Sequence, residues 1–203
     1  SSPSALTIEA TARLVDSLGG RGIPCRVDHG NDQEVEALFR RVREQSGRLD
    51  ILVNNAYQIP DPPVFGGGFW EHPVSLWDTQ CGVGLRGYYV ASVHGAPLMV
   101  AAGRGLIVNI SSRGAFRGEP DAPAYGASKA GLNALSQSLA RALAPQRVIV
   151  LCIAPGWVAT DMAADHLAGP INQGAARVAG VDRRIGLDQL EALIGKAQAV
   201  DVA

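Results

Sequence analysis

Two hydrophobic periodicities alternate along the chain, and this alternation constrains the fold more than any other feature. Stretches with apolar residues at helical spacing take turns with short, almost wholly apolar stretches of strand length. That order predicts an α/β fold in which a doubly wound parallel sheet is the middle layer of an αβα sandwich. The predicted helices span residues 5–18, about 31–43, 75–98, 123–143 and about 187–199. The predicted strands span residues 23–27, 49–53, 106–110 and 148–153.

Glycine and proline interrupt this pattern in one region. Residues 58–73 are rich in both and are predicted to form a loop. Gly82, Gly84 and Gly87 lie inside the next predicted helix, where an interior Gly costs about 0.5–1 kcal/mol relative to Ala. The three glycines indicate an interrupted helix, a kink or a close approach of two helices.

Composition excludes several classes of protein. The formal net charge is −1, whereas nucleic-acid binders normally present a basic surface. No apolar run reaches the roughly 18–20 residues that span a bilayer. Three widely spaced cysteines form neither a disulfide framework nor a metal motif, and Cys25 and Cys152 are expected to be buried in strands. We therefore expect one cytoplasmic domain over residues 1–203 that binds no nucleic acid, membrane or metal.

Polar or backbone-exposing residues follow each predicted strand at its carboxyl end. Ligands of open parallel sheets bind at that edge, because the strand ends meet there. We therefore expect a functional site at this edge of the sheet. The residues that follow the four strands are Asp28-His29-Gly30, Asn54-Asn55-Ala56-Tyr57, Ser111-Ser112 and Pro155-Gly156.

Tyr125 and Lys129 are the candidate catalytic pair. They stand four positions apart near the start of a predicted helix, so they share one helix face. A neighbouring ammonium lowers the pKa of a phenol, which makes the phenol an acid or base usable near neutral pH. Ser112, at the end of the preceding strand, offers a hydroxyl that could orient a substrate oxygen. The pair can also be an ordinary contact on a helix surface, but Ser112 lies in no nucleophile elbow that would indicate a hydrolase.

These motifs together resemble the short-chain dehydrogenase/reductases over about residues 5–162. The separation of Ser112 and Tyr125 is similar to that of the family's catalytic pair. Tyr57 and the stretch that begins FWEHPVSLWD resemble the member-one subgroup of that family. The motifs that carry the resemblance are Asn54-Asn55-Ala56, Ile110-Ser111-Ser112, Tyr125-Gly126-Ala127-Ser128-Lys129, and Pro155-Gly156 with Thr160.

The resemblance implies a Rossmann-like domain that binds NAD or NADP and interconverts a carbonyl and a secondary alcohol. Tyr125 would be the general acid/base, Lys129 would lower its pKa and bind the nicotinamide ribose, and Ser112 would polarise the substrate carbonyl. The partners implied are a small-molecule carbonyl or alcohol and further copies of the chain, as a homodimer or homotetramer. The other residues implied to contact the cofactor are Asp28, Asn54, Ala56, Pro155, Gly156 and Thr160.

Two features depart from the family's pattern. Gly84 stands where the family usually has an Asn that completes a proton relay through water. The family's first strand, Gly-rich turn, helix and second strand have no counterpart at the front, and its C-terminal strand has none after Val200-Asp201. Residues 1–203 are therefore expected to be incomplete at both ends. The absence of the two strands at the front is expected to leave a gap in the sheet between residues 23–27 and 49–53. Both departures favour an alternative, a catalytically weak or inactive nucleotide-binding or scaffold homologue of the same fold.

Overall fold

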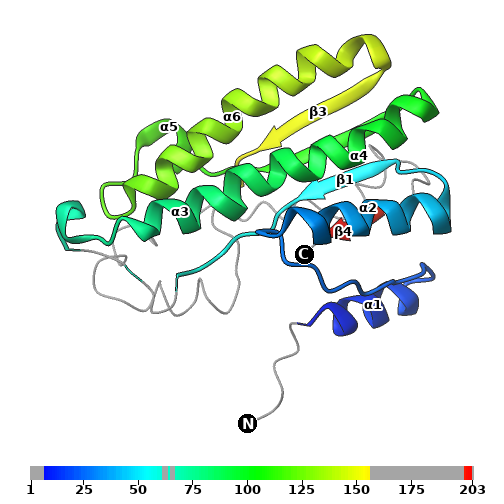
Figure 1. The fold of residues 1–203 in the computed structure, drawn as a ribbon, viewed down its shortest axis with the longest axis horizontal. Helices are drawn as coiled ribbons and strands as arrows, with labels where there is room; N and C mark the ends of the chain where they lie inside the picture. Colours follow the sequence, from blue (N-terminus) through cyan, green and yellow to red (C-terminus); the bar gives the residue numbers. More distant parts are fainter. Residues whose placement is uncertain (1–6, 61–63, 65–66, 156–198, 203) are drawn as a thin grey trace.

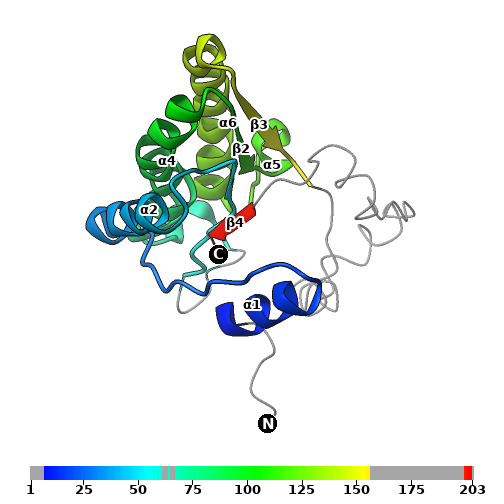
Figure 2. The same ribbon diagram turned by 90° about the vertical axis from the view of Figure 1, so that its right-hand side faces the viewer.

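A four-stranded parallel sheet organises the chain, which the computed structural model describes over residues 7–60, 64, 67–155 and 199–202. The strand order is β3-β2-β1-β4. Helices α2, α4 and α6 lie along one face of this sheet (Figures 1 and 2). The strands are β1 (Ile51–Asn54), β2 (Gly105–Ile110), β3 (Val148–Ile153) and β4 (Ala199–Val202). The helices are α1 (Ile8–Ser17), α2 (Asp32–Ser46), α3 (Ser75–Cys81), α4 (Tyr88–Ala102), α5 (Gly114–Arg117) and α6 (Pro123–Leu143), with a π-helix η2 (Gly82–Gly87) and 3-10 turns η1 (Phe69–Glu71) and η3 (Ala144–Gln146).

The strand predicted at residues 23–27 is wrong. These residues form no sheet pairing, and Ile23 is 43% exposed. Apolar, β-branched residues favour a strand only where a neighbouring strand accepts their backbone hydrogen bonds. No described strand lies beside them, so this segment runs as irregular chain towards α2.

The edge of β1 that faces away from β2 is paired with β4, although the sequence predicts a gap in the sheet on that side. β4 runs parallel to β1 with Ile51 opposite Ala199 and Asn54 opposite Val202. The helix predicted at about 187–199 lies outside the described residues, apart from Ala199, which belongs to this strand. Nothing in the periodicity of the tail predicted β4.

The glycine-rich stretch of the predicted helix at 75–98 is a π-helical turn. η2 separates α3 from α4, so the helix continues with a wider turn rather than ending. Gly87 allows a close approach here, because a Cβ at this position would lie 3.1 Å from the His29 carbonyl oxygen. The interruption indicated by the three glycines is therefore confirmed, and its form is a π-bulge.

The core lies between the sheet and helices α2 and α4. Leu52 and Ile107, from β1 and β2, are completely buried beneath these helices. Gly95 allows α4 to pack closely against α2 and the sheet, because an added Cβ would lie 2.9 Å from the Phe39 ring and 3.1 Å from Leu52. The remaining buried members of the cluster are Val35, Leu38, Leu49, Val90, Ala91, Leu98, Met99 and Val148.

The two cysteines predicted to be buried are not. Cys25 is only partly buried, because it lies in irregular chain rather than in a strand. Cys152 is exposed, because β3 is the edge strand of the described sheet. The Cys152 thiol donates to Asn133 Oδ1 at 3.1 Å, so the thiol faces α6.

A buried chain of polar side chains crosses the sheet beneath its carboxyl edge. The Asn54 amide donates to Asn109 Oδ1 at 2.8 Å, and the Asn109 amide donates to Ser136 Oγ at 2.9 Å. Asn54 and Asn109 are 4% and 0% exposed, so neither can bond to bulk water. The chain therefore joins β1, β2 and α6, the three elements from which the candidate site extends.

Candidate active site

The start of α6 is fixed against the end of β2. Pro123 stands in the first turn of the helix, where its missing N–H leaves no hydrogen bond unmade. Two residues link the elements: the Lys129 ammonium donates to the Ile110 carbonyl at 2.8 Å, and Ser111 Oγ donates to Asn133 Oδ1 at 2.7 Å. The candidate catalytic residues of α6 therefore lie beside the carboxyl end of β2, as the sequence predicted.

Lys129 is a buried cation. The residue is 4% exposed, and burial lowers the pKa of its ammonium to about 8. No carboxylate among the described residues forms an ion pair with Lys129. Its nitrogen lies 5.9 Å from the centre of the Tyr125 ring, which brings the predicted pair together.

Tyr125 is held by a second tyrosine. The rings of Tyr57 and Tyr125 meet edge to face, with centres 5.5 Å apart and planes at 79°. Tyr57 is anchored in turn, because its hydroxyl donates to Gln80 Oε1 at 2.6 Å. Burial raises the pKa of Tyr57, which keeps its hydroxyl neutral and able to donate.

Ser112 lies immediately after β2 and next to Ser111. Its hydroxyl oxygen accepts the Gly114 N–H at 3.1 Å, and this bond orients the side chain in the turn that leads into α5. The hydroxyl proton is not used in that bond and is available for an acceptor. Ser112 is thus positioned as a hydrogen-bond donor at the edge that carries Tyr125 and Lys129.

Besides Tyr125 and Lys129, the residues predicted to contact the cofactor lie in different environments. Asp28 is exposed in the loop before α2, where its carboxylate accepts the Gly30 N–H at 2.8 Å. Asn54 is buried in the polar chain described above, so its side chain stabilises the sheet. Ala56 and Pro155 follow β1 and β3 at the same sheet edge and are partly buried. The remaining two, Gly156 and Thr160, lie outside the described residues.

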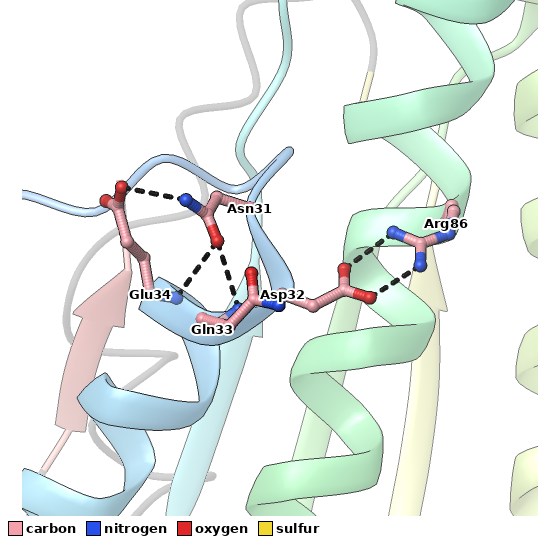
Figure 3. Close-up of polar contacts among 5 residues, drawn as sticks. All are labelled: Asn31, Asp32, Gln33, Glu34 and Arg86. Carbon is pink, nitrogen blue, oxygen red and sulfur yellow. Dashed lines mark hydrogen bonds and ion pairs between the residues drawn. The ribbon is translucent and has the colours of Figure 1, made fainter.

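The loop that carries Asp28 is braced against η2. Asn31 caps α2 by accepting the N–H groups of Gln33 and Glu34, and Asp32 binds Arg86 through two hydrogen bonds of 2.6 Å (Figure 3). The Arg86 guanidinium lowers the pKa of Asp32. The brace places this loop beside the π-helical turn that precedes Tyr88.

Sequence reasoning missed three side chains of the site. Tyr57 was noted at a strand exit and as a subgroup feature, but its contact with Tyr125 was not predicted. Gln80 and Tyr88 lie inside the helical run, where nothing in the spacing distinguishes them from core residues. Tyr88 is 2% exposed, and its ring centre is 5.2 Å from the Lys129 nitrogen. These contacts depend on the packing of three separate elements around one lysine.

The donor set fits the nicotinamide half of a dinucleotide. The Lys129 ammonium donates one of its three N–H groups to the Ile110 carbonyl oxygen. Two N–H donors remain for hydroxyls such as those of a ribose. A phenol and a serine hydroxyl at the same edge fit an oxygen that gains or loses a proton. The described residues contain no group of three His, Cys, Asp or Glu side chains that could hold a metal ion, and no helix within them is long and apolar enough to cross a membrane.

The fold and these residues define a class of protein, and a family model confirms it. The chain belongs to the short-chain dehydrogenase family, whose model matches residues 3–170.

The chain is similar to particular members of that family. It is 44% identical over 165 residues to mouse dehydrogenase/reductase SDR family member 1, covering 80% of this chain and 52% of the relative. The human protein of the same name is 43% identical over the same length. The chain thus spans about half the length of these curated relatives, and the predicted subgroup is confirmed.

Solved structures agree with the assignment. A metagenomic short-chain oxidoreductase crystallised with NADP matches with a TM-score of 0.68 and 36% identity, over 79% of this chain and 72% of the other. A short-chain dehydrogenase/reductase from Burkholderia xenovorans matches with a TM-score of 0.74 and 29% identity, over 84% and 64% of the two chains. The Rossmann-like αβα fold predicted from the sequence is therefore confirmed.

Proposed function

We propose that the protein is an NAD(P)-dependent oxidoreductase that interconverts a carbonyl and a secondary alcohol. The observation that carries this proposal is the buried Lys129 ammonium, held by the Ile110 carbonyl beside the ring of Tyr125. A bound nicotinamide would supply or accept the hydride. The chain's own residues would position the substrate oxygen and move its proton.

Tyr125 acts as the general acid in carbonyl reduction and as the general base in alcohol oxidation. Its hydroxyl donates a proton to the oxygen as the carbon is reduced, which leaves a phenolate. The Lys129 ammonium stabilises that phenolate, because opposite charges in a water-poor site attract strongly. With a pKa of about 8, Lys129 is mostly protonated at neutral pH and can fill this role.

Ser112 donates a hydrogen bond to the substrate oxygen and orients the carbonyl towards Tyr125. Around the cofactor, Lys129 binds the nicotinamide ribose, and the loop containing Asp28 receives the adenine. The backbone after Asn54, including Ala56, lies along the adenosine side. Pro155, Gly156 and Thr160 flank the nicotinamide. The whole protein acts on small carbonyl or alcohol substrates as a cytoplasmic homodimer or homotetramer.

Gly84 favours a second candidate, a homologue that binds a nucleotide without efficient turnover. A glycine at this position supplies no side chain to a proton relay. The retained Ser112, Tyr125 and Lys129 favour the enzyme, because a scaffold has no need of all three. NADH and NADPH titrations of the whole protein, followed by cofactor oxidation against a panel of aldehydes and ketones, separate the candidates. Cofactor binding without oxidation of NADH or NADPH by any carbonyl would support the scaffold.

Replacing Ser112 with Ala tests the role of its hydroxyl. We expect kcat/KM for the best carbonyl of the panel to fall by about 10²-fold, since one donor to a developing oxyanion is lost. Cofactor affinity should remain unchanged, because the hydroxyl contacts the substrate. Ser138→Ala removes an exposed hydroxyl from the same helix that carries Tyr125 and serves as the matched control. Equal kcat/KM in both variants would remove Ser112 from the mechanism.

A further inference from the structure

Three of the chain's four tyrosines surround one ammonium group. The Lys129 nitrogen lies 5.2 Å from the ring centre of Tyr88, 5.8 Å from that of Tyr57 and 5.9 Å from that of Tyr125. These distances are within the roughly 6 Å over which a cation is attracted to the face of an aromatic ring. The rings come from three elements: the chain after β1, helix α4 and helix α6.

The rings supply the stabilisation that a carboxylate would otherwise give. Lys129 is 4% exposed and has the Ile110 carbonyl as its hydrogen-bond acceptor among the described residues. A buried cation needs compensating negative potential, because desolvation favours the neutral amine. The other ionisable group that acts on Lys129 is the Cys152 thiol of β3, whose negative form would favour the cation. The π faces of the tyrosines therefore provide much of the local negative potential.

Tyr57 and Gly84 fit together. A Cβ at Gly84 would lie 3.7 Å from Cδ2 of Tyr57, an ordinary van der Waals contact, so Gly84 packs beside the edge of this ring. The hydrogen bond to Gln80 Oε1 fixes the other end of Tyr57. The glycine that departs from the family's pattern thus lies next to the Tyr57 ring.

Tyr88 contributes its ring rather than its hydroxyl. The side chain is buried, and its hydroxyl has no hydrogen-bond partner among the residues that the structure describes. Burial raises the pKa of Tyr88, so the hydroxyl stays protonated and adds no charge. The contact of Tyr88 with the site is therefore made by its ring, whose centre lies 5.2 Å from the Lys129 nitrogen.

We propose that Tyr57 and Tyr88 are positioning residues that complete, with Tyr125, a tyrosine cage holding Lys129 as an ammonium in the active site. The cage keeps the cation in place beside the Tyr125 phenol, where the family's pattern would have an Asn at the position of Gly84. Its catalytic consequence rests on the function proposed above. The state of Lys129 itself can be measured without turnover.

The pKa of Lys129 is the direct readout. The whole protein, without cofactor, would be labelled with ¹³C and ¹⁵N at lysine and titrated by NMR, with Lys129→Arg identifying the signal. We expect Tyr57→Leu and Tyr88→Leu each to lower the pKa of Lys129 by roughly 0.5–1, since each removes one aromatic face and keeps the site apolar. Tyr57→Phe and Tyr88→Phe keep the ring and should shift it by less than half as much.

Tyr89→Leu is the matched control. Tyr89 is the neighbour of Tyr88 on α4, but it is 50% exposed and makes no ring contact with Lys129. This variant should leave the pKa of Lys129 unchanged. If Tyr88→Leu fails to fold, the partly exposed Tyr57 and its Leu and Phe variants decide the matter.

Two outcomes separate the cage from the proposed function. An unchanged or raised pKa of Lys129 in folded Leu variants would overturn the cage, whatever the activity. A lowered pKa in a protein that reduces no carbonyl would support the cage and count against the proposed function alone. In an active protein, the alkaline limb of the kcat/KM profile should also move to lower pH, because the Leu variants lose the ammonium sooner as pH rises.

Discussion

Tyr125→Phe is expected to reduce carbonyl turnover by about 10²–10⁴-fold, the range over which a positioned acid or base contributes to rate. The change removes the hydroxyl that would carry the proton and keeps the ring that packs edge to face on Tyr57. Stability should therefore change by less than about 0.5 kcal/mol. Steady-state oxidation of NADH or NADPH and urea unfolding give the two measurements on the same preparation.

Tyr89→Phe provides the comparison for that experiment. It also deletes one tyrosine hydroxyl, but from an exposed side chain of α4 that does not contact Lys129. Its turnover should match that of the unmodified protein. Substantial turnover in Tyr125→Phe would assign proton transfer to another group.

Asn109→Leu is expected to lower the free energy of unfolding by about 2–4 kcal/mol. Asn109 is completely buried and bonds Asn54 on one side and Ser136 on the other. Leu has a similar volume, so the main effect is the loss of partners for two buried polar groups, at about 1–3 kcal/mol each. Ser136 still donates to the Leu132 carbonyl at 2.7 Å, which limits its share. Urea unfolding measures the loss.

A double variant distinguishes lost partners from a misfitting leucine. Asn54→Leu combined with Asn109→Leu removes both partners of the hydrogen bond between these two residues. The loss of unfolding free energy in the double variant should therefore be smaller than the sum of the losses in the two single variants. Ser138→Ala, whose exposed hydroxyl bonds only along α6, should alter stability by less than about 0.5 kcal/mol. Strictly additive losses would show that the two asparagines stabilise the sheet independently.

The sequence predicted the elements whose signals are local. Helix α6 begins at the expected Pro123 and ends at Leu143, and β3 covers the expected residues 148–153. Helix α2 has its acidic residues in the first turn and Arg43 in the last, as the helix dipole favours. The strand predicted at residues 23–27 was wrong because a strand forms only beside a neighbouring strand, and no local pattern reveals whether that neighbour is present.

In the candidate site, too, the contacts within one helix could be predicted and those between separate elements could not. Tyr125 and Lys129 are neighbours on one helix, so their spacing alone predicted the contact that the structure gives. Tyr57 and Tyr88 reach Lys129 from other elements, and their part depends on the packing of β1, α4 and α6. Asn54 was expected to support both the adenosine side of the cofactor and the central strand. Its amide donates to Asn109 inside the sheet, and its place beside a cofactor stays a prediction.

The π-helical turn η2 sets the angle, about the helix axis, between the side chains of α3 and those of α4. Gln80 and Tyr88 are eight positions apart, and in a continuous α-helix they would point about 80° away from each other. One extra residue in a wider turn reduces that difference to about 20°, so both side chains can face the same lysine-centred site. Gln80 and Tyr88 are accordingly both buried, at 4% and 2% exposed. Removing a single residue from Gly82–Gly87 would leave every site residue in the sequence and turn one of these two away, so the length of this turn is itself a determinant of the site.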